Sequence, residues 1–215
     1  MRSFSDLFSR IQQAIDSGLP GEESQLKMAP AFRPKGPASQ NPPPRKAAVL
    51  IPVYFSIEGN PEILLTLRKT YDGIHSAQVS FPGGKFESHE TDPVEVALRE
   101  SQEEVGLDPA AVKIAGLLSP LYIPVSHMMV QPVIGFVEGP VKWIPDLREV
   151  ERLICISMEN LTDPSLVQAK AVRISATLTM EAPFYSIANE TVWGATAMIL
   201  SEWIDVWKRS VINLP

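Results

Sequence analysis

The chain has 215 residues, 45% of them apolar, and a formal net charge of −6. A chain of this length can bury one sizeable core, and its acidic balance argues against a nucleic-acid-binding surface. No apolar run is long enough to span a bilayer, and the amino terminus lacks the apolar core of a signal peptide, so no membrane partner is expected. The single Cys155 excludes an internal disulfide and indicates a cytoplasmic protein. Because Cys155 lies in an apolar run, we expect a buried strand thiol and not a nucleophile.

Residues 1–20 are predicted to form an amphipathic helix. Apolar side chains recur there at helical spacing, at Phe4, Leu7, Phe8, Ile11 and Ile15. This face is expected to pack on the domain or on a second copy in a homodimer. Residues 21–45 are rich in proline and predict an extended connector. We therefore expect removal of residues 1–40 to leave the chemistry of residues 46–210 measurable.

The remaining chain, residues 46–210, predicts an α+β fold. Strands are expected at 47–55, 62–68, 112–118, 129–137, 152–156, 171–178 and 184–187, and helices at 93–105 and 194–207. Strands flanked by helices predict a mixed β-sheet between helical layers, an α/β/α sandwich.

The helix at 93–105 has the clearest start and stop signals. Asp92 is a good N-cap, Pro93 suits the first helical position, and Glu95 completes an Asp-x-x-Glu pattern. Gly106 suits the left-handed residue after a helix, and Leu107 can pack behind it.

Three carboxylates lie on one face of this helix. Glu100, Glu103 and Glu104 are spaced i, i+3 and i+4, so they repel one another unless a cation lies among them. Hard oxygen ligands suit Mg²⁺ or Mn²⁺. A solvated acidic face is the alternative, but Arg99 can orient Glu103 one turn away. The preceding Gly83-Gly84 pair lets the backbone approach a ligand closely.

These residues resemble the Nudix box, G-x5-E-x7-R-E-U-x-E-E-x-G-U, where U is aliphatic. The fixed positions are held by Gly84, Arg99, Glu100, Glu103, Glu104, Gly106 and Leu107. Two features depart from the box: Ser101 replaces an aliphatic residue, and fourteen residues instead of thirteen separate Gly84 from Arg99. The extra residue leaves open whether Glu90 fills the first Glu position. The resemblance implies a Nudix fold and hydrolysis of a nucleoside diphosphate derivative.

A segment before the box is similar to the signature of the coenzyme A pyrophosphatase subgroup. It comprises Leu64-Leu65-Thr66-Leu67-Arg68 and the stretch from His75 through Gln78 to Gly84, with Lys69, Gly73 and Ala77 departing from the signature. The subgroup implies cleavage of coenzyme A to 3′,5′-ADP and 4′-phosphopantetheine. ADP-ribose or another nucleoside diphosphate sugar is the alternative substrate, and a non-catalytic nucleotide-sensing module is a third reading.

The resemblance also implies roles for individual residues. Glu100, Glu103 and Glu104 are expected to bind the metal, with Glu103, Glu104 and Arg99 in catalysis. The general base is one of these carboxylates or a carboxylate from another loop. Substrate is expected at Gly83, Gly84, Arg68, His75 and Gln78. A second acidic cluster, Asp146, Glu149 and Glu151, alternates with arginines and is expected to form a salt-bridged face.

Overall fold

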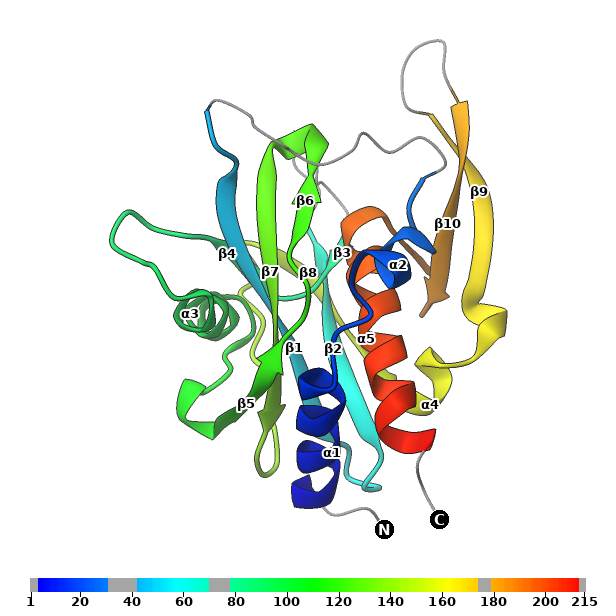
Figure 1. Cartoon of the computed structure of the whole chain (residues 1–215). Helices are drawn as coiled ribbons and strands as arrows, with labels where there is room; N and C mark the ends of the chain where they lie inside the picture. Colours follow the sequence, from blue (N-terminus) through cyan, green and yellow to red (C-terminus); the bar gives the residue numbers. More distant parts are fainter. Residues whose placement is uncertain (1–3, 31–41, 70–77, 174–178, 213–215) are drawn as a thin grey trace.

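The centre of the molecule is a mixed eight-stranded sheet (Figure 1). A computed structural model describes residues 4–30, 42–69, 78–173 and 179–212. The strands of this sheet are β1 (Arg45–Phe55), β2 (Pro61–Arg68), β3 (Val79–Ser80), β4 (Gly83–Lys85), β5 (Val112–Leu117), β6 (Leu121–Ile123), β7 (Met128–Val137) and β8 (Val150–Ser157). Their order is β3-β2-β1-β7-β5, while β4 pairs with β1, β6 with β7 and β8 with β2. Strands β1 and β7 run parallel, which confirms the predicted mixed sheet.

Helix α3 (Pro93–Val105) covers one face of this sheet and has the bounds predicted from sequence. The Asp92 carboxylate accepts a hydrogen bond from the Val94 N–H at 2.9 Å and caps the first turn. Gly106 ends the helix in the left-handed region at φ 67°, and its N–H donates to the Gln102 carbonyl. Both predicted helix signals are confirmed, and they fix the position of the carboxylates along the helix.

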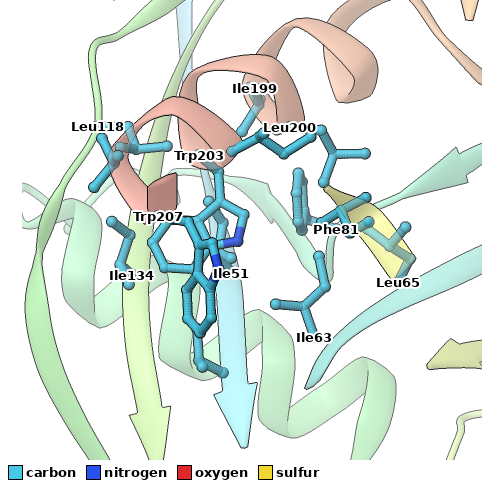
Figure 2. Packing of buried hydrophobic residues seen from close by; sticks show 14 of the residues in the cluster. Ile51, Ile63, Leu65, Phe81, Leu118, Ile134, Ile199, Leu200, Trp203 and Trp207 are labelled. Atoms are coloured by element: carbon cyan, nitrogen blue, oxygen red, sulfur yellow. The ribbon is translucent and has the colours of Figure 1, made fainter. Parts of the chain in front are cut away.

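The opposite face is covered by α1 (Phe4–Asp16) and α5 (Gly194–Ile212), with the main apolar core between helices and sheet (Figure 1). Trp203 of α5 is fully buried among strand side chains that include Ile51 and Ile63 (Figure 2). Leu7 and Ile11 of α1 are also fully buried in this core. The opening helix is therefore an integral part of the fold, which argues against our expectation that it can be removed.

The stretch predicted as an extended connector begins with a helix. Helix α2 (Gly21–Leu26) packs on α5, and Ser24 and Gln25 are buried there. Residues 31–41, which include Pro34 and Pro37, lie outside the described residues. The division of the chain at residues 20 and 45 stays a prediction.

A second, three-stranded antiparallel sheet lies at the edge of the molecule beyond α5 (Figure 1). It consists of β9 (Val167–Arg173), β10 (Thr179–Ile187) and β11 (Glu190–Trp193), and the short helix α4 (Met158–Leu161) follows β8. Part of the strand predicted at 171–178 lies outside the described residues. Strand β11 was not predicted, and α5 begins directly after it. Among the helices of the described ranges, none has the length and apolarity needed to cross a membrane.

Candidate active site

The glycine pair on β4 brings the backbone against the carboxylates of α3. A Cβ atom added at Gly84 would lie 2.3 Å from the carboxyl carbon of Glu100. The Gly83 N–H donates to Oε2 of Glu104 at 3.4 Å. Gly83 itself has φ 153°, and a Cβ there would lie 2.4 Å from the Ala48 carbonyl oxygen. The pair therefore makes room for two carboxylates of the protein itself, a close approach that the sequence analysis had assigned to a ligand.

Glu104 is a buried carboxylate, with 5% of its side chain exposed. Its pKa is raised to about 7, chiefly by burial and also by the nearby charges of Glu100 and Glu149, while Arg68 and the Gly83 N–H act in the opposite direction. The ionised form of Glu104 is therefore disfavoured in this position, chiefly by burial. The site is therefore electrostatically suited to an added cation.

Glu100 and Glu103 flank this buried group. Burial raises the pKa of Glu100 above its ordinary value, although Arg99 opposes the rise. The Glu100 carboxylate lies 3.0 Å from Nη1 of Arg99. The Glu103 side chain is 59% exposed and accepts from the same Nη1 at 3.2 Å. The expected contact between Arg99 and Glu103 is present, and Arg99 also holds Glu100.

Arg99 makes its shortest contact with Glu90. Its Nε donates to Oε1 of Glu90 at 2.8 Å, and its Nη2 donates to Oε2 at 3.1 Å. These hydrogen bonds, with one from the Glu87 N–H, lower the pKa of Glu90 to about 2. Nη2 also donates to the Lys85 carbonyl. Despite the extra residue in the loop, Glu90 lies against Arg99 and ties the loop to the helix.

The serine that replaces an aliphatic residue in the box is accommodated inside α3. Ser101 is fully buried, and its hydroxyl donates to the Ala97 carbonyl at 2.6 Å. Because a hydroxyl satisfied by the preceding turn leaves no unpaired polar atom, the substitution is compatible with a buried position.

Arg68, one of the expected substrate-binding residues, lies beside these carboxylates. Nη1 of Arg68, the last residue of β2, lies 3.6 Å from Oε1 of Glu104. The Arg68 N–H donates to the Gln78 carbonyl at 3.0 Å, which places the Gln78 backbone next to Arg68. His75 lies outside the described residues. The structure thus brings Gly83, Gly84 and Arg68 to the carboxylates of α3.

Glu149 is a site residue that the sequence reasoning missed. It is exposed, its carbonyl accepts from the Lys69 N–H at 2.9 Å, and its charge raises the pKa of both Glu100 and Glu104. Asp146 does form the predicted ion pair, at 2.6 Å from Arg148. The pairing of β8 with β2 and the hydrogen bond from the Asp146 N–H to the Glu104 carbonyl bring the segment that holds Glu149 to the box, and no local sequence signal marks these contacts.

The donor atoms of this site fit a hard divalent cation, since they are carboxylate oxygens. Within the described residues, however, no three Asp, Glu, His or Cys side chains are arranged to hold a metal ion. The carboxylates are instead held by Arg99 and Arg68. Joint coordination of one cation by Glu100, Glu103 and Glu104 would require these side chains to rotate.

One prediction outside the box, the burial of Cys155, is wrong. Cys155 is exposed on β8, not buried, and desolvation by its neighbours raises the pKa of the thiol, which disfavours a reactive thiolate.

Comparison with known proteins agrees with this geometry. The sequence pattern of the NUDIX domain matches residues 44–153. The chain belongs to the Nudix family. It is 34% identical to an uncharacterized Nudix hydrolase, NudL, of Pectobacterium atrosepticum, over 83% of this chain and 88% of the relative. It is also 34% identical to the human mitochondrial coenzyme A diphosphatase NUDT8, over 73% of this chain and 66% of the relative.

A solved structure supports the fold. The crystal structure of a Nudix hydrolase from M. smegmatis, RenU, superposes with a TM-score of 0.53 at 16% identity, over 80% of this chain and 89% of that one. Together with the family match, this confirms the Nudix fold. The protein is a Nudix hydrolase, an enzyme acting on phosphorus-containing acid anhydrides, and this excludes the non-catalytic sensing module.

Proposed function

We propose that this Nudix hydrolase cleaves the diphosphate bond of a nucleoside diphosphate derivative with the help of Mg²⁺ or Mn²⁺. The observation that carries the proposal is the buried Glu104 carboxylate beside Glu100 at the glycine pair of β4. A carboxylate cluster of this kind is expected to bind a cation and, with it, an anionic diphosphate.

In this proposal Glu100, Glu103 and Glu104 hold the divalent cation. The bound cation would neutralise the charge of the substrate diphosphate. Arg99 acts through the other residues, because it holds Glu103 in place and anchors the loop through Glu90. Gly83 and Gly84 let the carboxylates lie against β4, so their contribution is to the shape of the site.

A carboxylate must also take the proton from the attacking water. Glu103 and Glu149 are the candidates for the general base, because both carboxylates are exposed to water. Glu104 is less suited to this role, since its carboxylate is buried.

Coenzyme A is the substrate that we propose. The Leu64-to-Arg68 segment and the stretch before the box are similar to the coenzyme A subgroup, and the human relative at 34% identity is named a coenzyme A diphosphatase. The products would be 3′,5′-ADP and 4′-phosphopantetheine, or its acyl form from an acyl-CoA. Arg68, His75 and Gln78 would then bind substrate. ADP-ribose or another nucleoside diphosphate sugar remains the second candidate, because Lys69, Gly73 and Ala77 depart from the subgroup signature.

Turnover of a panel of diphosphates tests the chemistry. Purified protein is assayed with coenzyme A, 3′-dephospho-coenzyme A and ADP-ribose, with Mg²⁺, Mn²⁺ or a chelator. We expect turnover only with the metal, and a loss of at least about 10²-fold in Glu103→Gln, the scale of losing a ligand or a general base. Glu95→Gln, an exposed carboxylate on the first turn of α3, is the matched control and should retain full activity. Undiminished activity in chelator would refute metal dependence.

The ratio of kcat/KM values tests the substrate. A coenzyme A enzyme should favour coenzyme A over ADP-ribose by at least about tenfold, the equivalent of one modest interaction. A ratio near one, or a preference for ADP-ribose, would remove coenzyme A and leave the hydrolase assignment intact.

We also propose a cytoplasmic location and a homodimer. The single cysteine supports a reducing compartment. Two relatives carry names that place them in mitochondria, so fluorescence of the tagged full-length chain is the test of location. Light scattering of the purified chain tests the dimer.

A further inference from the structure

Two arginines contact the carboxylates of the site, and they are held very differently. Arg99 makes two hydrogen bonds to Glu90, the shorter at 2.8 Å, and three further contacts with Glu100, Glu103 and the Lys85 carbonyl. Such a network fixes the guanidinium in one place. Arg99 is therefore suited to a structural role.

Arg68 makes a longer and weaker contact with its partner, Glu104. The distance from its Nη1 to Oε1 of Glu104 is 3.6 Å, whereas a charge-assisted hydrogen bond is usually about 2.7–2.9 Å. Its Nε is shielded from solvent and has no hydrogen-bond acceptor within the described residues. A guanidinium with an unused donor beside a buried carboxylate can move to a better acceptor at little cost.

The position of Arg68 is also the position that a cation would need. Its guanidinium is the positive group nearest to the buried Glu104 carboxylate in the described part of the chain, and Glu104 is one of the proposed metal ligands. Two positive groups cannot share this carboxylate without repulsion.

We propose that Arg68 is an exchangeable counter-ion of Glu104. Its guanidinium neutralises the buried carboxylate while no divalent cation is bound, and it turns to the diphosphate of the substrate when a cation takes its place. This inference rests on the proposed function, because it assumes that Glu104 is a metal ligand.

The exchange has a thermodynamic consequence. Metal binding frees the guanidinium for the diphosphate, and diphosphate binding draws the guanidinium away from Glu104. Each ligand should therefore increase the binding affinity of the other by more than their direct electrostatic attraction explains. The two increases in affinity must be equal, because the coupling is reciprocal. Arg68 would lower the metal affinity of the empty enzyme and raise it in the presence of substrate.

Mn²⁺ binding to the full chain tests this directly. The free Mn²⁺ signal in electron paramagnetic resonance gives the Kd alone and with α,β-methylene-ADP, a diphosphate that resists hydrolysis. For the native chain we expect the diphosphate to lower the Kd for Mn²⁺ at least about tenfold. For Arg68→Gln we expect the Kd for Mn²⁺ alone to fall about fivefold, and the tightening by the diphosphate to shrink to about twofold. Arg68→Lys, which keeps the charge, should restore the native Kd for Mn²⁺ alone.

Arg152→Gln is the matched control. Arg152 lies on β8 opposite Leu67 and pairs with Glu190 at 2.7 Å, so its removal changes the net charge equally without touching Glu104. Its Mn²⁺ affinity and coupling should stay native. A weaker or unchanged Mn²⁺ affinity in Arg68→Gln, or equal tightening in Arg68→Gln and Arg152→Gln, would overturn the exchange.

The native chain provides a test that does not depend on the folding of a variant. If the Kd for Mn²⁺ of the native chain were the same with and without α,β-methylene-ADP, the exchange would be overturned even if Arg68→Gln failed to fold. If the native chain bound no Mn²⁺ and hydrolysed no diphosphate, the proposed function would fail with it. If the native chain hydrolysed a diphosphate but bound Mn²⁺ equally well with and without α,β-methylene-ADP, the exchange would be refuted and the proposed function would stand.

Discussion

The Glu202 carboxylate of α5 accepts a hydrogen bond from the Gln25 side chain of α2 at 2.9 Å, across 177 positions of sequence. Its other oxygen accepts from the backbone N–H groups of Gly21 and Ser119, at 3.2 and 3.1 Å. Glu202 is fully buried, so these three donors replace the water that its charge has lost. One carboxylate thereby joins α2, α5 and the loop before β6.

Glu202→Gln should destabilise the protein. The substitution places an amide NH₂ where an oxygen now accepts, so at least one of the three donors faces another donor and stays unpaired. We expect a loss of about 1–3 kcal/mol in the free energy of unfolding, measured by urea denaturation. Glu23→Gln, on the exposed side of α2, should change it by less than about 0.5 kcal/mol. Equal stability of the two variants would refute a structural role for the Glu202 contacts.

The opening helix gives a second stability prediction. Ile11 is fully buried between α1 and the sheet, so Ile11→Ala leaves a cavity and should cost about 2–5 kcal/mol. Gln13→Ala, exposed on the same helix, is the control and should be close to neutral. Thermal denaturation of the two variants compares them. A neutral Ile11→Ala would contradict a contribution of α1 to the stability of the core.

Local signals and long-range contacts differ in how far the sequence predicts them. The bounds of α3 were predicted because Asp92 and Gly106 act within one turn of the helix they delimit. The contacts of Glu202 and Glu149 were not, because they join segments that meet only through tertiary packing. The amphipathic pattern of α1 predicted a buried face, yet the proline-rich stretch after it led us to separate the helix from the core that buries it.

The glycine pair of β4 should be intolerant of a methyl group. A Cβ at Gly84 would overlap the carboxyl carbon of Glu100 at 2.3 Å, so Gly84→Ala must displace that carboxylate. We expect kcat to fall at least about tenfold, since small displacements of catalytic groups are costly. In a Glu100→Ala background, Gly84→Ala should add little further loss, because the group that it displaces is already gone. Additive losses in the double variant would show that Gly84 acts independently of Glu100.

Glu104 leads to a prediction about pH. A carboxyl group whose pKa is about 7 in the folded protein, and near 4.5 when unfolded, favours its neutral form in the fold. Its contribution to stability is therefore fully present below pH 4.5 and is lost as the pH rises to about 7. Glu104→Gln lacks this loss. In metal-free buffer the free energy of unfolding of the variant should therefore rise relative to that of the native chain between pH 4.5 and 7. At pH 8 the difference should be on the order of 1–3 kcal/mol.

Urea denaturation of the metal-free protein at pH 5 and pH 8 measures this gain. Glu103→Gln is the control, since its carboxylate is 59% exposed and its removal should give the same difference from the native chain at both values. Turnover of Glu104→Gln should fall at least about 10²-fold even though its stability rises, because Glu104 is a metal ligand in the proposed function. A stability difference between Glu104→Gln and the native chain that is the same at pH 5 and pH 8 would contradict the raised pKa.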